Sequence, residues 1–204
     1  MSDIKNCIDA LNKKGFKAVE VKDAKAAVEK ILEIIGPDKT IGAGGSMTLK
    51  EIGIEDVLLE RGNTVYSSSA ARKTGMDKEE ALKNAMTADF FLSSTNAVTL
   101  EGDFINIDAI GNRVAGMFYG PEKVVIVTGK NKITSNAHTA VRRIKEIASP
   151  LNTKRLGLDT PCAKTGKCTD CKSPQRICNV TVRITNPPWG KEMYVILIDG
   201  DYGF

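Results

Sequence analysis

The sequence predicts an α/β fold with a mainly parallel sheet flanked by helices. Strand-like and helix-like hydrophobic patterns alternate along the chain, which is typical of parallel sheets with helical crossovers. Residues 123–128, Lys-Val-Val-Ile-Val-Thr, are a continuous apolar run of the kind that lies buried in such a sheet. The chain has 204 residues, of which 42% are hydrophobic and 26% charged. This composition suits a globular protein, and we expect a single domain over residues 1–204.

Helices and strands are expected in turn through the first half of the chain. Residues 3–14 carry apolar side chains with helical spacing, and Gly15 suits the end of that helix. Asp23 is a suitable N-cap for a second helix, which Gly36 and Pro37 end. The other elements expected here are strands at 16–21, 39–43, 63–67 and 89–94, and helices at 48–60 and 77–88.

The second half predicts a hairpin, a buried strand, one long helix and two late strands. Residues 97–100 and 104–108 flank Glu-Gly-Asp, a hairpin signal. The buried strand 123–128 is followed by a helix at 136–148. Residues 150–180 are expected to be an irregular, cysteine-rich segment, followed by strands at 178–185 and 193–199.

The charge balance and the apolar runs exclude several kinds of partner. The net charge of +4 is concentrated at residues 151–178, but that stretch has no aromatic side chain to stack on a base, so nucleic acid is not an expected partner. The sequence has no apolar run long enough to span a membrane. Residues 1–12 lack the apolar core of a signal peptide. We therefore expect a cytoplasmic protein without membrane contact. A homo-oligomer is a separate expectation.

A glycine-rich turn joins an expected strand to an expected helix. Gly44, Gly45, Ser46 and Thr48 would present backbone N–H groups, hydroxyl groups and the positive end of the helix. These groups suit a phosphate or carboxylate. The spacing matches neither the Walker motif nor the dinucleotide fingerprint. A tight packing turn without a ligand is the alternative.

Small polar residues end the strand at 89–94, and Ser94 and Asn96 are among them. The carboxyl ends of parallel strands line the ligand crevice in open α/β sheets, so both are candidate ligand-binding residues. A simple Asx or serine turn is the alternative.

Asp108 and Arg113 are the candidate catalytic residues, and Asn112 beside them is a candidate ligand-binding residue. The alternation of 104–108 places Asn106 and Asp108 on one side of a strand. Asp108 could position a substrate hydroxyl or act as a base, and Arg113 could form a fork with a carboxylate or phosphate. A structural ion pair between them is the alternative.

Gly129, Asn131 and Lys132 follow the buried strand 123–128 and are further candidate ligand-binding residues. Lys132 could neutralise an anion, whereas a solvated loop is the alternative. We expect these residues and the other polar strand ends to open on one edge of the same sheet. His138, the single histidine, falls on an expected surface helix, so no Ser-His-Asp or Cys-His system is expected.

Four cysteines lie close together near the end of the chain, with the spacing Cys162-x5-Cys168-x2-Cys171-x6-Cys178. The Cys-x-x-Cys pair lets two thiolates reach one metal from a single turn, and the other two could complete the ligand set. Four thiolates suit Zn²⁺ or an iron–sulfur cluster. Reduced, buried or redox-active cysteines without metal are the alternative. Cys7 is expected in the core.

Several of these motifs together resemble the lactate-utilisation (LUD) domain family, of the LutC/YkgG type. The resemblance is carried by Ser-Ser-Thr-Asn-Ala at 93–97, Asn-Ile-Asp at 106–108, Gly-Asn-Arg-Val-Ala at 111–115 and Gly-Lys-Asn-Lys-Ile at 129–133. Gly-Gly-Ser-Met-Thr at 44–48 also resembles the family's first glycine loop. The segment from Thr160 to Cys178 resembles a cysteine-bearing subgroup.

The resemblance implies a fold like that of ribose-5-phosphate isomerase, glucosamine-6-phosphate deaminase and the coenzyme A transferases (NagB/RpiA/CoA transferase-like). It also implies a role in the oxidation of L-lactate to pyruvate beside iron–sulfur partner proteins. Two hypotheses follow. In the first, the crevice binds a small anionic metabolite. In the second, the chain is a non-catalytic assembly or electron-transfer subunit whose four-cysteine cluster binds iron–sulfur or zinc and docks on a partner.

Overall fold

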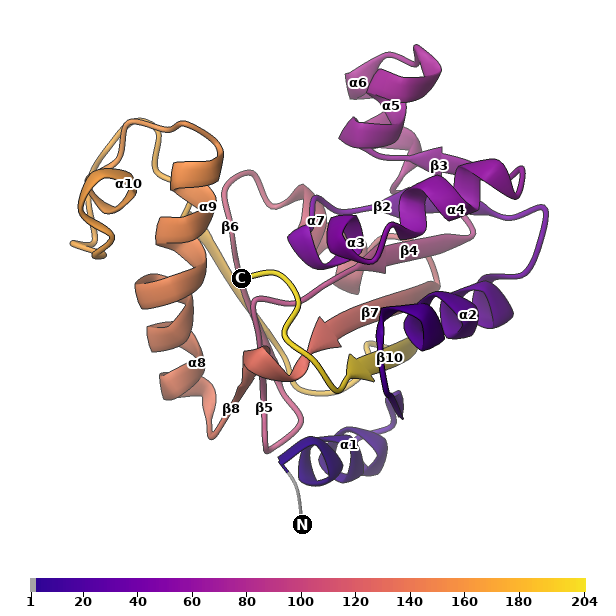
Figure 1. The fold of residues 1–204 in the computed structure, drawn as a ribbon, viewed down its shortest axis with the longest axis horizontal. Coiled ribbons are helices and arrows are strands. Elements are labelled where there is room, and N and C mark those ends of the chain that lie inside the picture. Colours follow the sequence, from indigo (N-terminus) through magenta and orange to yellow (C-terminus); the bar gives the residue numbers. More distant parts are fainter. Residues whose placement is uncertain (1–2) are drawn as a thin grey trace.

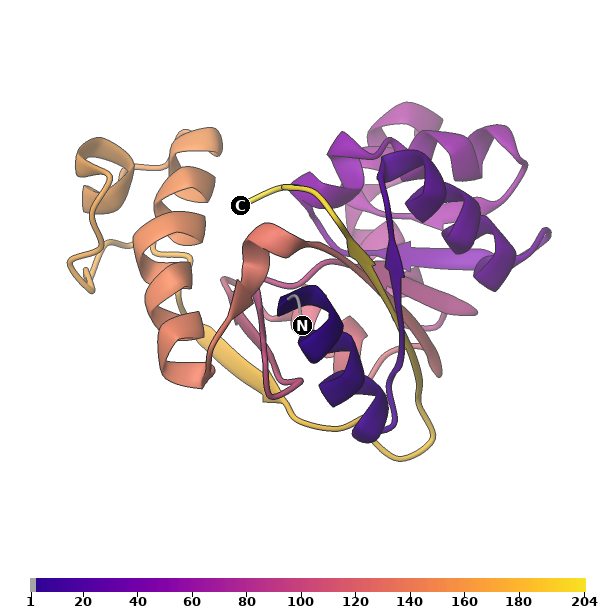
Figure 2. The same ribbon diagram turned by 60° about the horizontal axis from the view of Figure 1, so that its bottom comes forward.

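The computed structural model describes residues 3–204, which form two β-sheets with helices packed against them (Figures 1 and 2). The strands are β1 (Lys17–Val21), β2 (Thr40–Ala43), β3 (Thr64–Tyr66), β4 (Phe90–Ser93), β5 (Ala97–Thr99), β6 (Phe104–Asp108), β7 (Lys123–Gly129), β8 (Ile133–Thr134), β9 (Val180–Ile184) and β10 (Glu192–Ile198). The helices are α1 (Asp3–Lys13), α2 (Ala24–Ile35), α3 (Met47–Glu51), α4 (Ile54–Glu60), α5 (Ser68–Thr74), α6 (Lys78–Asn84), α7 (Asn112–Phe118), η1 (Lys130–Lys132), α8 (Ala137–Arg143), η2 (Ile144–Ala148), α9 (Ser149–Arg155) and α10 (Pro161–Thr165).

Six strands form an all-parallel sheet in the order β1-β10-β7-β4-β2-β3. The central strands β10, β7 and β4 are mostly buried, because helices cover both faces of the sheet. β2, β4 and β7 are adjacent and parallel, so their carboxyl ends meet at one edge of the sheet. This edge positions the polar residues described below.

The alternation of side chains divides the core into two layers. Leu92 and Val125 point to the face covered by α2, α3 and α4, where Ile31 is buried. Phe91 and Val124 point to the opposite face, covered by α1 and α7. Cys7 of α1 is fully buried there, as the sequence predicts.

The second sheet has four strands in the order β8-β5-β6-β9. β5 and β6 form the predicted hairpin, β9 pairs antiparallel with β6, and β8 runs parallel to β5. Ile105 of this sheet packs against Ala140 and Ile144, which belong to the helical run α8–η2–α9. In Figure 1 this run, together with α10, forms a lobe beside the larger sheet.

The α/β class and the parallel sheet flanked by helices are confirmed, but the prediction of an irregular segment at 150–180 is wrong in part. Residues 150–155 belong to α9, and α10 is a further helix inside the cysteine-rich segment. α5 and α7 are helices for which the sequence analysis makes no prediction. The predicted hairpin lies in the second sheet. Within residues 3–204, no helix is long and apolar enough to cross a membrane.

Candidate functional site

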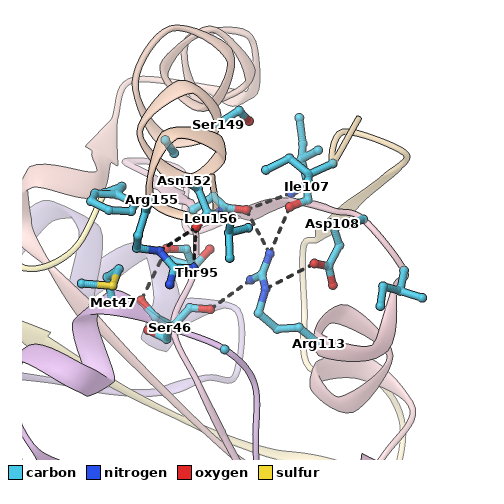
Figure 3. A pocket seen from close by; sticks show the side chains of 18 of the residues that line it. Ser46, Met47, Thr95, Ile107, Asp108, Arg113, Ser149, Asn152, Arg155 and Leu156 are labelled. Atoms are coloured by element: carbon cyan, nitrogen blue, oxygen red, sulfur yellow. Dashed lines mark hydrogen bonds and ion pairs between the residues drawn. The ribbon is translucent and has the colours of Figure 1, made fainter. Parts of the chain in front are cut away.

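A cavity of about 280 Å³ opens where the carboxyl edge of the large sheet meets the second sheet and α9 (Figure 3). We call it the strand-end crevice. Residues from all four predicted segments line it, namely Gly45, Ser46, Ser94, Asn96, Asp108, Asn112, Arg113 and Lys132. The structure therefore brings together predicted residues that lie up to 87 positions apart in the chain, from Gly45 to Lys132.

Arg113 lies at the base of the crevice and is almost entirely buried, with 8% of its surface exposed. Its Nη1 donates to the Asn106 Oδ1 at 2.7 Å and to the Ser94 carbonyl at 3.3 Å. Its Nη2 donates to the Asn96 Oδ1 at 3.0 Å and to the Ile107 carbonyl at 3.2 Å. The four Nη hydrogens are thus already used, and the predicted fork onto a ligand would require breaking some of these bonds.

Asp108 and Arg113 form the ion pair that the sequence raises as the structural alternative, with 3.8 Å between Asp108 Oδ1 and Arg113 Nε. Asp108 Oδ2 also accepts from the backbone N–H of Val114 at 3.3 Å. Burial lowers the pKa of Arg113 and the Asp108 carboxylate opposes that shift. Asp108 still lines the crevice, so a structural contact and a place in the site coexist.

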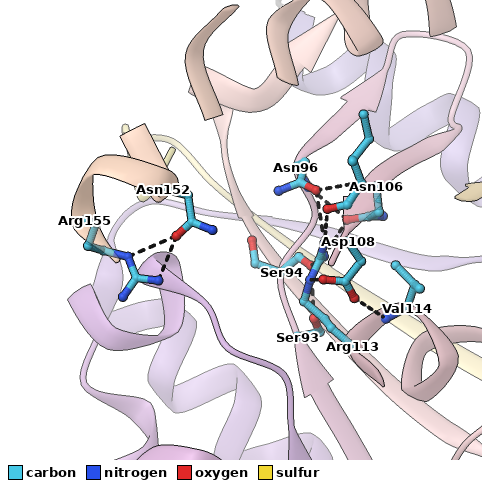
Figure 4. Close-up of polar contacts among 10 residues, drawn as sticks. Ser93, Ser94, Asn96, Asn106, Asp108, Arg113, Val114, Asn152 and Arg155 are labelled. Carbon is cyan, nitrogen blue, oxygen red and sulfur yellow. Dashed lines mark hydrogen bonds and ion pairs between the residues drawn. The ribbon is translucent and has the colours of Figure 1, made fainter. Parts of the chain in front are cut away.

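Asn96 is held by its amide oxygen and presents its amide nitrogen to the crevice. The Asn96 Oδ1 accepts from Arg113 Nη2 and from the Ile107 N–H at 2.9 Å. Figure 4 shows the Asn96 nitrogen on the side that faces Asn152 and Arg155. No acceptor within residues 3–204 bonds this Nδ2 in the structure, so its donors are available to a ligand.

Asn106 lies behind Asn96 and is fully buried. Its Oδ1 accepts from Arg113 and from the Asn96 N–H at 3.0 Å. Its Nδ2 is the one buried side-chain nitrogen or oxygen among the described residues that has no hydrogen-bond partner. Arg113 therefore fixes two asparagines at once, and only Asn96 lines the crevice.

Lys132 contributes a buried amine to the crevice, with 4% of its surface exposed. Its Nζ donates to the Thr48 Oγ1 at 2.7 Å and to the Ser94 Oγ at 3.1 Å. Burial, followed by the nearby Arg143 and Arg113 cations, lowers the pKa of Lys132 to about 7, against a smaller opposite effect of Glu51. At neutral pH this amine is divided between its charged and neutral forms.

The remaining predicted ligand-binding residues do not line the crevice. Gly44 packs against Arg113, whose Cγ would lie 2.6 Å from an added Cβ. Thr48 is fully buried and bonds Lys132 and the Tyr202 carbonyl. Gly129 and Asn131 contact the chain's last residues, and the Asn131 amide bonds the backbone of Tyr202 and Gly203. In this structure these four residues support the wall of the crevice.

One wall of the crevice is absent from the sequence prediction. It comes from α9, which places Asn152 and Arg155 on the crevice. The Arg155 guanidinium donates to the Asn152 Oδ1 at 2.7 and 3.1 Å and has no acidic partner within residues 3–204. The helical spacing of Ala148, Asn152 and Arg155 places them on one face of a helix, and this pattern could have indicated the wall from the sequence.

The charged side chains among the described residues that line the crevice are three basic ones and one acidic one. The basic ones are Arg113, Lys132 and Arg155, and the acidic one is Asp108. Such an excess of positive charge in a partly enclosed site attracts anions.

The four clustered cysteines surround a second, smaller cavity of about 20 Å³, which we call the cysteine cavity. Cys162 is buried beside the hydroxyl groups of Thr153 and Thr160, and the Cys178 Sγ donates to the Ser149 Oγ at 3.3 Å. The Cys168 Sγ accepts from the backbone N–H of Asp170 at 3.4 Å. Burial raises the pKa of the Cys178 thiol.

All five cysteines in the chain are free thiols in the structure. The donor chemistry of the cysteine cavity suits Zn²⁺ or an iron–sulfur cluster. However, no group of three or more His, Cys, Asp or Glu side chains within residues 3–204 is arranged so that it could hold a metal ion. The four thiols share a cavity without forming a ready-made set of ligands.

The chain is an α/β protein with a cavity lined by basic side chains at the carboxyl edge of a parallel sheet. The chain belongs to the LUD domain family, whose model matches residues 4–198. This family is associated with lactate utilisation.

A comparison with solved structures found a similar crystal structure, that of a DUF162 family protein from Deinococcus radiodurans. It has a TM-score of 0.57 and 12% sequence identity, and the match covers 97% of this chain and 99% of that chain. At this identity the likeness concerns the fold alone. A search of curated proteins found no match.

Proposed function

We propose that the strand-end crevice binds a small carboxylate metabolite of lactate utilisation, of the size of lactate or pyruvate. The observation that carries this proposal is the joint presence of the Lys132 amine, the Asn96 amide nitrogen and the Arg155 guanidinium around one cavity. Its volume of about 280 Å³ is at the small end of the range for ligand sites.

The residues divide into those that contact the ligand and those that position them. The protonated amine of Lys132 and the guanidinium of Arg155 attract the carboxylate, and Asn96 donates a hydrogen bond to it. Arg113 acts through Asn96, since its own Nη hydrogens are occupied. Asp108 helps to hold Arg113.

The test is a titration of the full chain with lactate, pyruvate and inorganic phosphate, followed by thermal unfolding and calorimetry. A ligand that binds the folded chain raises the melting temperature by mass action. Lys132→Met and Asn96→Ala should remove most of the shift. Lys130→Met is the matched control, because Lys130 lies two positions away, is exposed and pairs with Asp199.

Because the charge of Lys132 depends on pH, the anion affinity measured in this titration should depend on pH as well. Because the pKa of Lys132 is about 7, the charged form that attracts an anion is lost as the pH rises through that value. Lactate affinity should therefore be higher at pH 6 than at pH 8.5 in the wild type, and almost independent of pH in Lys132→Met. Absence of any melting shift with all three anions would refute the proposed function.

A second candidate function follows from the cysteine cavity. In it, the four cysteines bind zinc or an iron–sulfur cluster, and the chain acts as a non-catalytic assembly or electron-transfer subunit beside iron–sulfur proteins of lactate oxidation. The gathering of all four thiols around one cavity favours this function, whereas a metal would require them to move closer together. Metal analysis and an absorption spectrum of protein purified without oxygen test it.

A further inference from the structure

The Lys132 amine differs from an ordinary anion-binding lysine in its partners. It donates to two neutral hydroxyl groups, those of Thr48 and Ser94. No carboxylate within residues 3–204 forms an ion pair with it. A buried ammonium group without a carboxylate is poorly stabilised, so this environment favours the neutral amine.

The positive groups around Lys132 also favour the neutral form of its amine. Arg143 is held beside the crevice by bonds from its guanidinium to the carbonyls of Asn131 and Asn96. Arg113 donates to the carbonyl of Ser94, the residue whose hydroxyl group accepts from Lys132. A lysine desolvated next to other cations is activated as a nucleophile towards carbonyl carbon.

The hydrogen bonds of the Lys132 amine also suit a nucleophile. A neutral amine has two hydrogens and one lone pair. The two hydroxyl groups of Thr48 and Ser94 can accept both hydrogens, which leaves the lone pair in the remaining tetrahedral direction. Lys132 is one of the residues that line the strand-end crevice, so its amine belongs to the same cavity as a ligand bound there.

We propose that Lys132 forms an imine with the carbonyl group of a 2-oxo acid bound in the strand-end crevice. This inference rests on the proposed function, because the carboxylate of the ligand must first be held there. The Nζ lone pair attacks the carbonyl carbon to give a carbinolamine. Both amine hydrogens and the carbonyl oxygen then leave as one water molecule, so the step requires no oxidant, reductant or co-reactant.

Asn96 and Arg155 suit the other end of the same ligand. The Asn96 nitrogen lies on the side of Asn96 that faces Asn152 and Arg155 (Figure 4), and both Asn96 and Arg155 can donate to a carboxylate. A 2-oxo acid places its carbonyl carbon next to its carboxylate. Its carboxylate and its electrophilic carbon therefore suit two kinds of group that line the same crevice, the hydrogen-bond donors and the Lys132 amine. A 2-hydroxy acid has the same carboxylate but no electrophilic carbon.

The experiment is reductive trapping of the full chain with pyruvate and sodium cyanoborohydride, read by intact mass and peptide mapping. Lys130 serves as the reference lysine in the same molecule, since its bond to Asp199 raises its pKa and keeps it protonated. An ordinary lysine is neutral in roughly one molecule in a thousand at pH 7. We therefore expect trapping at Lys132 on the order of a hundredfold faster than at Lys130.

Three further results are expected. Lactate should slow the trapping by competition without itself forming an adduct. Trapping should become faster as the pH rises from 6 to 8, which is opposite to the pH dependence of lactate affinity. Lys132→Arg should give no adduct but still show a lactate-dependent melting shift, because arginine keeps the charge and cannot form this imine.

The outcomes separate the inference from the proposed function. If lactate and pyruvate both raise the melting temperature but Lys132 is trapped no faster than Lys130, the imine is refuted and anion binding stands. If neither anion shifts the melting temperature and no adduct maps to Lys132, both fail. An adduct that maps to Lys132 and is lost in Lys132→Arg supports the imine.

Discussion

The strand-end crevice and the cysteine cavity differ in how their polar groups are held. In the crevice, Asn96, Arg113 and Lys132 come from separate segments, and each is fixed by hydrogen bonds to other parts of the chain. In the cysteine cavity, the thiols come from one short stretch, and their contacts are weak bonds to hydroxyl or backbone groups. The polar side chains of the crevice are therefore held in fixed positions, whereas the thiols of the cysteine cavity are not arranged to hold a metal ion.

The largest expected effect tests the preorganisation of the crevice. Arg113→Ala removes the group that bonds Asn96, Asn106 and two backbone carbonyls. It leaves these buried acceptors and the Asp108 carboxylate without their cation. Loss of one partner from a buried ionic network costs about 3–5 kcal/mol. Urea unfolding at pH 7 should show a decrease of this size in the free energy of unfolding.

Arg155→Ala is the control for Arg113→Ala, since it removes an arginine from the same crevice. Arg155 is exposed and bonds only Asn152 among the described residues. Its loss should change the free energy of unfolding by no more than about 0.5 kcal/mol. Equal effects of the two variants would mean that the crevice is not held together by Arg113.

The second prediction is an increase in the free energy of unfolding. Lys132→Met should stabilise the chain by about 1–3 kcal/mol at pH 7, because the methionine removes a poorly compensated buried amine. The hydroxyl groups of Thr48 and Ser94 stay bonded to each other. Such a gain in stability from removing a site residue is the usual mark of a functional group held at a cost.

The pH dependence of that gain follows from the pKa of Lys132. The folded chain holds it at about 7, below the ordinary value of 10.5. Between these values the unfolded chain binds more protons, so the stability of the wild type rises with pH. The advantage of Lys132→Met should be full below pH 7 and vanish towards pH 10.5. Melting curves at pH 6 and 9 check this, and a constant difference would contradict it.

The residues of the crevice could be predicted from the sequence where they follow a recognisable buried strand. The strands that end at Ser93 and Gly129 are continuous apolar runs. The parallel arrangement then places their polar successors at one edge. The internal bonding of Arg113 could not be predicted in this way, because it depends on Asn106 in a different sheet.

The sequence does not predict the wall formed by α9, because a proline such as Pro150 usually ends a helix. Proline has no N–H to donate and clashes with the preceding turn. Here the helical run continues past it, since the five-residue π-helix η2 immediately precedes Ser149 and Pro150. π-helical turns are rare and have no clear sequence pattern. Asn152 and Arg155 therefore remained outside the predicted site.

A third prediction tests the loose organisation of the cysteine cavity. Cys168→Ser and Cys171→Ser should each change the free energy of unfolding of metal-free protein by less than about 1 kcal/mol, because both side chains are only partly buried. If the second candidate function is correct, either variant should also lose most of the metal that the wild type holds. Full metal content in both variants would contradict that ligand set.

The smallest expected effect is a change in anion affinity on replacing Asp108, whose side-chain carboxylate lines the crevice. In Asp108→Asn, the amide oxygen can still accept from the Val114 N–H, and Arg113 keeps its four Nη bonds. The lost contact is a largely buried ion pair at 3.8 Å, and its loss leaves the buried Arg113 without that countercharge. The free energy of unfolding should therefore fall, but by less than in Arg113→Ala, which also removes the hydrogen bonds.

Anion affinity in Asp108→Asn should rise rather than fall. The variant removes the negative charge from a cavity whose other charged groups are basic, and Arg113 stays in place through its other bonds. We expect lactate to bind about two- to fivefold more tightly at low salt, with a smaller gain at high salt because counter-ions screen the removed charge. Calorimetric titration at two salt concentrations measures this, with Asp159→Asn on the exposed α9–α10 connection as the control. Weaker binding would mean that Asp108 contacts the ligand directly, through a hydroxyl group that requires a carboxylate as acceptor.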